Sequence, residues 1–108
     1  MVTGFGDMQG LLRQAQEMQR KLQDVQRSLG EQQVEGSAGG GAVRVVVSGN
    51  QDVLSVKILP AAVDPADVET LEALVAGAVK QAMQSAKQLR DREMQKVTGG
   101  LNLPGMGF

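Results

Sequence analysis

The chain has 108 residues and a net charge of −1, and it contains neither cysteine nor histidine. Without these residue types it lacks a disulfide framework, a thiolate nucleophile and the commonest metal ligand and general base, so we expect no enzyme, no metal site and no cofactor. No apolar run approaches the about 18 residues of a membrane-spanning helix, and the N-terminus does not resemble a signal peptide, which predicts a cytoplasmic protein with no membrane or small-molecule partner.

The first predicted element is an amphipathic helix over about residues 7–29. Its apolar residues recur at alternating intervals of three and four and fill the a and d positions of a heptad, which is typical of a coiled-coil-like contact face. This contact face, here called the first seam, consists of Met8, Leu11, Ala15, Met18, Leu22, Val25 and Leu29. Asp7 is expected to cap the start of the helix, and Gly30 to take the left-handed conformation that often ends one.

Three short strands are predicted next, at about residues 32–37, 42–48 and 53–59, because the apolar residues now recur at every second position. The intervening turns are too short for a crossover connection, so the sheet should be antiparallel with strand order 1-2-3. We interpret Gly39–Gly41 as the first turn rather than as a phosphate-binding loop, since no Gly-Lys-Ser/Thr motif follows and the next element is a strand.

Alternation along the second and third strands divides the predicted sheet into two faces. One face is strongly apolar and should pack against the helices, with contributions from Val43, Val45, Val47, Leu54, Val56 and Ile58. The other face is mixed in character. Its apolar residues are candidates for a dimer interface, and they are Val46, Val53 and Leu59.

The last predicted element is a long helix over about residues 65–97, with Asp64 as its cap and Pro65 at its first position. Its heptad positions are apolar as far as Leu89, apart from Ser85, but the same register then brings Arg92 and Lys96 to the contact face. Charged residues are rarely buried, so we expect the last two turns to stand in solvent. Residues 1–98 would form a single two-layer α+β domain, and the glycine-rich residues 99–108 a flexible tail.

Basic residues concentrate at the two ends of the chain. The net charge is +1 over residues 1–30, −5 over residues 31–79 and +3 from Lys80 onward. Arg13, Arg20 and Arg27 recur every seven residues at the heptad position opposite the first seam, about 10 Å apart by the helical rise. Such a row is either an ordinary solvated surface or a cationic track whose guanidinium groups meet the phosphates of a nucleic acid.

The order of elements and several local motifs resemble the YbaB/EbfC family of bacterial nucleoid-associated proteins. The resemblance rests on RQAQEMQRKLQDVQ in the first helix, the glycine-rich hairpin, VRVVVSGNQDVLSVKI, and a long terminal helix, and it extends to GFGDMQGLL and LPGMGF near the chain ends. It implies a tight homodimer shaped like tweezers, whose helical arms straddle duplex DNA, and no enzymatic activity. The DNA-binding residues implied on the two helices are Arg13, Arg20, Lys21, Arg27, Lys87, Arg90, Arg92 and Lys96.

From the charge distribution and the resemblance together we expect a homodimeric protein of the bacterial nucleoid that binds double-stranded DNA with little sequence specificity. Its expected roles are nucleoid organisation, gene regulation or DNA protection. The alternative is a coiled-coil-like interaction or chaperone module, in which the two seamed helices capture a protein partner. The shortness of the first helix, about three heptads, counts against that alternative.

Overall fold

The computed structural model describes residues 4–98, with side chains from Met8 onward. In chain order the elements are α1 (Gly4–Glu31), β1 (Gln33–Ala38), β2 (Val43–Ser48), β3 (Val53–Ile58), the 3-10 turn η1 (Pro60–Ala62) and α2 (Val68–Thr98). The three strands form an antiparallel sheet in the order β1-β2-β3. The predicted α+β fold is therefore confirmed, and each strand begins and ends within one residue of its predicted position.

Helix α1 differs from the prediction at both ends. It begins at Gly4, so Asp7 lies inside the helix rather than at its cap. Gly30 is also helical, and positive φ among the described glycines is confined to Gly39, Gly40 and Gly41. A left-handed residue is not needed at the end of α1, because the carbonyl of Leu29 accepts hydrogen bonds from the N–H groups of Gln32 at 3.2 Å and Gly49 at 2.9 Å.

The start of α2 is also later than predicted. Asp64 and Pro65 belong to a separate turn, in which the carboxylate of Asp64 accepts from the N–H of Ala66 at 2.9 Å. The helix cap is Asp67, whose carboxylate accepts from the N–H of Thr70 at 3.3 Å and from its hydroxyl at 2.6 Å. The sequence holds two Asp residues three positions apart, and the second one caps the helix.

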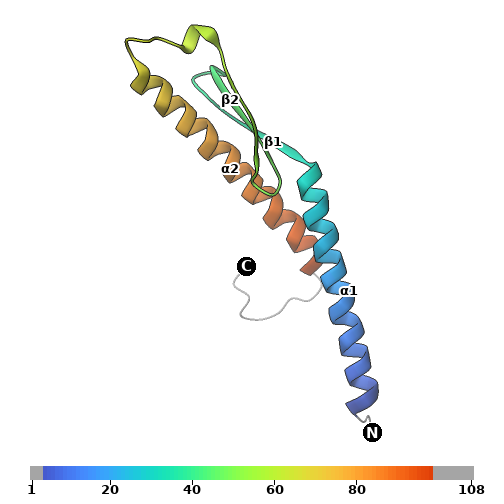
Figure 1. Cartoon of the computed structure of the whole chain (residues 1–108). Helices are drawn as coiled ribbons and strands as arrows, with labels where there is room; N and C mark the ends of the chain where they lie inside the picture. The colour runs from blue at the N-terminus through green and yellow to red at the C-terminus, as the bar shows by residue number, and fades with distance from the viewer. Residues whose placement is uncertain (1–3, 99–108) are drawn as a thin grey trace.

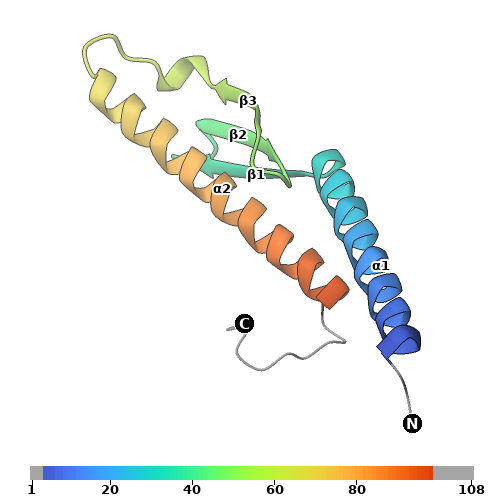
Figure 2. The same ribbon diagram turned by 60° about the horizontal axis from the view of Figure 1, so that its bottom comes forward.

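One layer of the molecule is the sheet, and α2 packs across β1 and β2 to form the other (Figures 1 and 2). The buried core consists of three valines of β2 and three alanines of α2, namely Val43, Val45, Val47, Ala78, Ala82 and Ala86. Gly36 of β1 permits this close packing, because a Cβ there would collide with the backbone of Ala78 and Ala82. The contact is therefore made between backbones, with small side chains on the helix.

The sheet extends beyond the helix that covers it. Val56 and Ile58 of β3 point to the same side as the buried valines of β2, yet they remain 45% and 38% exposed. The described chain is also elongated, with principal extents of 78 × 26 × 16 Å. Its radius of gyration is 20.9 Å, whereas a compact domain of this length would have about 13 Å. A single copy thus buries little of its apolar surface.

Candidate nucleic-acid interface

The three arginines predicted to form a row on α1 do lie on its exposed side. Arg13, Arg20 and Arg27 are all exposed, whereas Leu29 at the end of the first seam is buried. Lys21 is exposed as well. None of the ion pairs among the described side chains involves Arg13, Arg20 or Lys21. These three cations are therefore accessible to an anionic partner.

Carboxylates alternate with these arginines on the same side of α1. Glu17, Asp24 and Glu31 stand three or four positions from the arginines, which is the spacing of neighbours on a helix surface. The Nη2 atom of Arg27 donates to the carboxylate of Asp24 at 2.6 Å, and both side chains are largely exposed. The three arginines on α1 are therefore balanced by three carboxylates. These carboxylates are visible in the sequence, but the spacing of the arginines alone does not reveal them.

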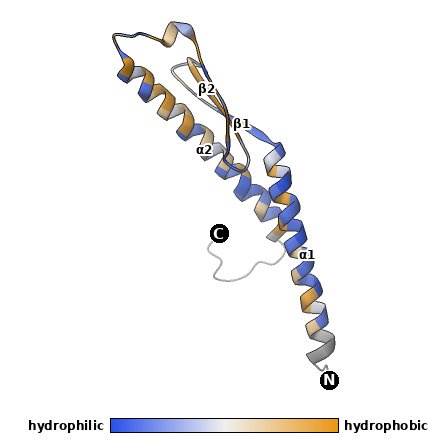
Figure 3. Ribbon diagram, viewed as in Figure 1, coloured by the Kyte–Doolittle hydropathy of each residue, from blue (hydrophilic) through white to orange (hydrophobic). Residues whose placement is uncertain are grey.

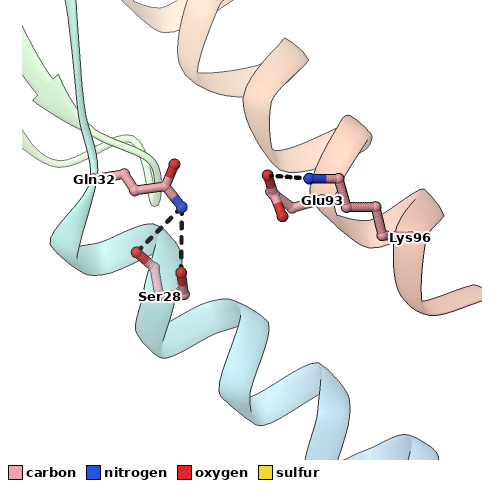
Figure 4. Close-up of polar contacts among 4 residues, drawn as sticks. All are labelled: Ser28, Gln32, Glu93 and Lys96. Carbon is pink, nitrogen blue, oxygen red and sulfur yellow. Dashed lines mark hydrogen bonds and ion pairs between the residues drawn. The ribbon is translucent and has the colours of Figure 1, made fainter.

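The C-terminal half of α2 carries the larger excess of positive charge. Lys87, Arg90, Arg92 and Lys96 are all exposed, and Lys80 lies about two turns before Lys87. Arg90 lies 3.9 Å from the adjacent Asp91, and Lys96 forms an ion pair with Glu93 at 3.2 Å (Figure 4). Exposed pairs of this kind contribute little and are easily exchanged for another anion. In Figure 3 the helix accordingly changes from mainly apolar colours near the sheet to mainly polar colours toward its end.

The sequence predicted that the last turns of α2 stand free in solvent, and this prediction is wrong. Arg92 and Lys96 are exposed, but Met94 and Val97 are half-buried, and the helix ends beside α1, which runs in the opposite direction (Figures 1 and 2). The prediction followed the heptad positions alone and overlooked these two apolar residues on the neighbouring side of the helix. The basic part of α2 and the accessible cations of α1 therefore lie toward the same end of the molecule.

Comparisons with known proteins show the family of the chain. The sequence matches the family model described as the YbaB/EbfC DNA-binding family over residues 5–101. The chain belongs to the YbaB/EbfC DNA-binding family. It is 47% identical over 103 residues to a nucleoid-associated protein of Alkaliphilus metalliredigens, a match that covers 95% of this chain and 90% of the relative. A nucleoid-associated protein of Moorella thermoacetica is 46% identical over 102 residues, covering 94% and 98% of the two chains.

Among solved structures, an uncharacterized protein of Helicobacter pylori has the same fold. The TM-score is 0.69 at 18% sequence identity, and the match covers 84% of this YbaB/EbfC chain and 92% of the other. YbaB/EbfC is a DNA-binding family rather than an enzyme family. Among the described residues no group of acidic side chains is arranged to hold a metal ion, and no described helix is long and apolar enough to cross a membrane.

The candidate dimer residues of this YbaB/EbfC chain do not all lie on one face. Val46 is half-buried on the face of the sheet turned away from α2. Val53 was predicted for that face, but a bulge in β3 shifts the register so that Val53 pairs with Val47, whose side chain faces α2. Leu59 follows β3 and is 56% exposed. Further exposed apolar residues, which the sequence interpretation did not assign to an interface, follow Leu59 in the chain.

These residues form what we call the β3 surface, which consists of Val53, Val56, Ile58, Leu59, Val63 and Val68. Each is a large aliphatic residue, and each is between 38% and 56% exposed. They belong to β3, which is an edge strand, to the segment that follows it and, in the case of Val68, to the first residue of α2. An edge strand with an apolar flank is a surface on which further chain can pack.

Proposed function

We propose that the chain is a nucleoid-associated protein that binds double-stranded DNA as a homodimer, through the basic ends of its helices and with little sequence readout. The observation that carries the proposal is the charge of α2 from Lys80 onward, where five basic residues oppose two acidic ones. Lys87 and Arg92 are exposed there and take part in none of the ion pairs among the described side chains. Membership of a DNA-binding family supports the same function.

The chemistry of this surface suits phosphates better than base edges. Guanidinium and ammonium groups on an exposed helix can follow the regular phosphate spacing of a duplex without reading its sequence. We rank α2 above α1 as the main contact, because the arginines of α1 are balanced by Glu17, Asp24 and Glu31. Arg13, Arg20 and Lys21, which have no described ion-pair partner, would supply secondary contacts.

The acidic middle of the chain restricts how the duplex can approach. Residues 31–79 carry a net charge of −5, and they include the sheet and the start of α2. A DNA backbone close to this region would be repelled, so the duplex should contact the opposite, basic end of each protomer. Such binding fits a cytoplasmic protein of the nucleoid that coats or organises DNA, with regulation or protection of DNA as consequences.

A second copy of the chain is the partner that the β3 surface fits. Six exposed large aliphatic residues in and after β3 would be costly to leave in water, and the long, thin protomer has a small core of its own. A two-fold axis at this surface would place the same residues of both copies in contact. Each dimer would then present two sets of basic helix ends to DNA.

A gel-shift series tests the function directly. Duplexes of unrelated sequence and equal length should be bound with similar affinity, and affinity should fall steeply as salt is raised from 50 to about 200 mM. Replacing Arg90, Arg92 and Lys96 together with alanine should weaken binding and reduce the salt dependence while the protein stays folded and dimeric. Binding that is unchanged in this variant, or that is confined to one sequence, would contradict the proposal.

A further inference from the structure

The connection between α1 and the sheet is a single residue, Gln32. One residue retains two soft backbone dihedral angles, so this connection alone leaves the direction of the helix open. The side-chain amide of Gln32 points back to α1 itself, where it donates to the hydroxyl of Ser28 at 3.3 Å (Figure 4). The direction of α1 must therefore be set by contacts with other elements.

The turn between β2 and β3, residues 49–52, lies against the C-terminal end of α1 (Figure 2). We call it the β2–β3 turn. The N–H of Gly49 donates to the carbonyl of Leu29 at 2.9 Å, and the Nδ2 of Asn50 donates to the carbonyl of Gln26 at 3.0 Å. The two carbonyls are three positions apart and thus lie on one side of the helix. Two hydrogen bonds on that side oppose both a tilt of the helix and its rotation.

Gly49 lets the turn and the helix approach each other closely. A Cβ at this position would lie 2.6 Å from the carbonyl oxygen of Leu29 and 3.0 Å from its Cβ. Gly49 is not among the described glycines with positive φ, so glycine is needed here for space rather than for its backbone conformation. An alanine could adopt the same backbone, but it would push the end of α1 away from the turn.

The β2–β3 turn is itself held firmly to the sheet. The hydroxyl of Ser48, which is only 3% exposed, accepts from the N–H groups of Asn50 and Asp52, both at 3.2 Å. The N–H of Ser48 in turn donates to the carbonyl of Asp52 at 2.8 Å. A buried hydroxyl that binds both sides of the turn orders its backbone. A helix that is bound to this turn therefore takes its direction from the sheet.

The contact between α1 and α2 is less specific in direction. On the first seam Met18, Leu22 and Val25 are only half-buried, and full burial is reached at Leu29, next to the β2–β3 turn. Apolar contact is non-directional, so it resists separation of the two helices more than it resists sliding or rotation. The directional hydrogen bonds from the turn supply what the apolar contact lacks.

We propose that the β2–β3 turn, through Gly49 and Asn50, positions α1 so that its cations and the basic end of α2 meet one DNA duplex. This role rests on the proposed function. Arg13 lies about 24 Å from Leu29 along the helix axis, so a tilt of about 10° at Leu29 would move it by about 4 Å. That displacement exceeds the rise of about 3.4 Å between successive phosphates of one strand. A helix that is already fixed also avoids the entropic cost of ordering it during binding.

Distances between spin labels on the two helices test the positioning, because the natural chain contains no cysteine. The labels are attached to Gln16→Cys on α1 and Gln88→Cys on α2, both exposed positions, and labelled chains are diluted with natural protein so that distances within one chain are measured. The turn variants are Asn50→Ala and Gly49→Ala. The matched control, Gln26→Ala, removes an exposed amide from the same end of α1 but keeps the carbonyl that accepts from Asn50.

In electron–electron double resonance without DNA, Asn50→Ala should widen the distance distribution at least about 1.5-fold, because a hydrogen bond that opposes motion of α1 is lost. Gly49→Ala should shift the mean distance, and Gln26→Ala should leave both mean and width unchanged. Distributions equal to that of the natural protein in both turn variants, or an equal change in the control, would overturn the proposal.

DNA binding by the same variants tests what the positioning is for. Asn50→Ala should bind a duplex at least about threefold more weakly than the natural protein, since binding must now order α1. Its slope of log affinity against log salt should not change, because no cation has been removed. Natural affinity in Asn50→Ala despite a wider distribution would also overturn the proposal. The distances are measured without DNA, so they decide whether the turn positions α1 even if the proposed function fails.

Discussion

Substitution of Leu59 by aspartate should separate the proposed dimer into monomers. Leu59 is 56% exposed in the single chain, belongs to the β3 surface and directly follows β3. Its backbone N–H donates to the carbonyl of Ala42 at 2.9 Å, and this hydrogen bond does not depend on the side chain. The protomer should therefore still fold when the leucine side chain is replaced.

The magnitude follows from the surface that a partner would cover. Complete burial of a leucine side chain contributes about 1.5–3 kcal/mol, so covering the exposed 56% contributes about 1–1.5 kcal/mol per copy and about 2–3 kcal/mol for the two copies of a dimer. A carboxylate at the same place adds the cost of removing a charge from water. We expect the dissociation constant of the dimer to rise at least about 100-fold, since each 1.4 kcal/mol corresponds to a factor of ten.

Sedimentation equilibrium over a dilution series measures this constant. The matched control is Leu12→Asp, which introduces the same change at a leucine that is 60% exposed on α1, away from the β3 surface. The control should remain as dimeric as the natural protein. Equal dissociation constants for the Leu59→Asp variant and the natural protein, or equal weakening by the two substitutions, would refute the assignment of the interface.

Three further substitutions test the fold that positions the arms. Gly36→Ala should destabilise the protein by about 3 kcal/mol, seen as a large drop in the thermal midpoint, because the new methyl group meets the backbone of α2 at Ala78 and Ala82. Gly10→Ala should instead stabilise α1 by up to about 1 kcal/mol, since no heavy atom lies within 4 Å of the added Cβ; a lower midpoint for this variant would show that the tip of α1 is not the open helix described. Asp67→Ala should cost about 1 kcal/mol through loss of the α2 cap, whereas an unchanged midpoint would mean that Asp64 can replace it.

The local pattern of the sequence was enough to predict the elements but not how each one ends. Strand positions and order followed from apolar alternation and from short, glycine-rich turns, and both are properties of neighbouring residues. Gly30 was expected to end α1 in a left-handed conformation, but the carbonyl of Leu29 is satisfied by Gly49, about twenty residues later in the chain. A long-range contact of this kind leaves no local signal.

The placement of Val53 shows a second limit of sequence reasoning. Strict alternation puts Val53 on the face opposite Val56 only if β3 is regular, but the bulge shifts the pairing by one residue and turns Val53 to the side of Val47. A bulge depends on how two strands meet, so the sequence of one strand does not reveal it. The apolar β3 surface became visible only when the position of α2 showed which part of the sheet it leaves uncovered.

The candidate DNA-binding residues were predictable as exposed cations, but their ion pairs with nearby carboxylates were not. All eight are exposed in the structure. The arginines of α1 were selected for their regular spacing, and the carboxylates between them were given too little weight. Arg27, for example, forms an ion pair with Asp24. We therefore rank the two helices by their net positive charge rather than by their number of arginines, and this ranking favours α2.

The most direct test of the account compares two variants that remove the same charges from different places. Arg92→Ala with Lys96→Ala removes one arginine and one lysine from the end of α2, and Arg44→Ala with Lys57→Ala removes the same two residue types from paired positions on the outer face of the sheet. Each pair includes one residue with an ion-pair partner, Lys96 with Glu93 and Arg44 with Glu35. The two variants are therefore matched in charge and in exposure.

The quantity to measure is the slope of log affinity against log salt concentration for one DNA duplex. Each lost phosphate contact lowers the slope by about 0.9, so the α2 variant should lose about 1.8 if one arm of the dimer engages the duplex and about 3.6 if both do. The sheet variant should keep the slope of the natural protein. Equal slopes for the two variants would contradict the claim that the basic ends of the helices bind DNA.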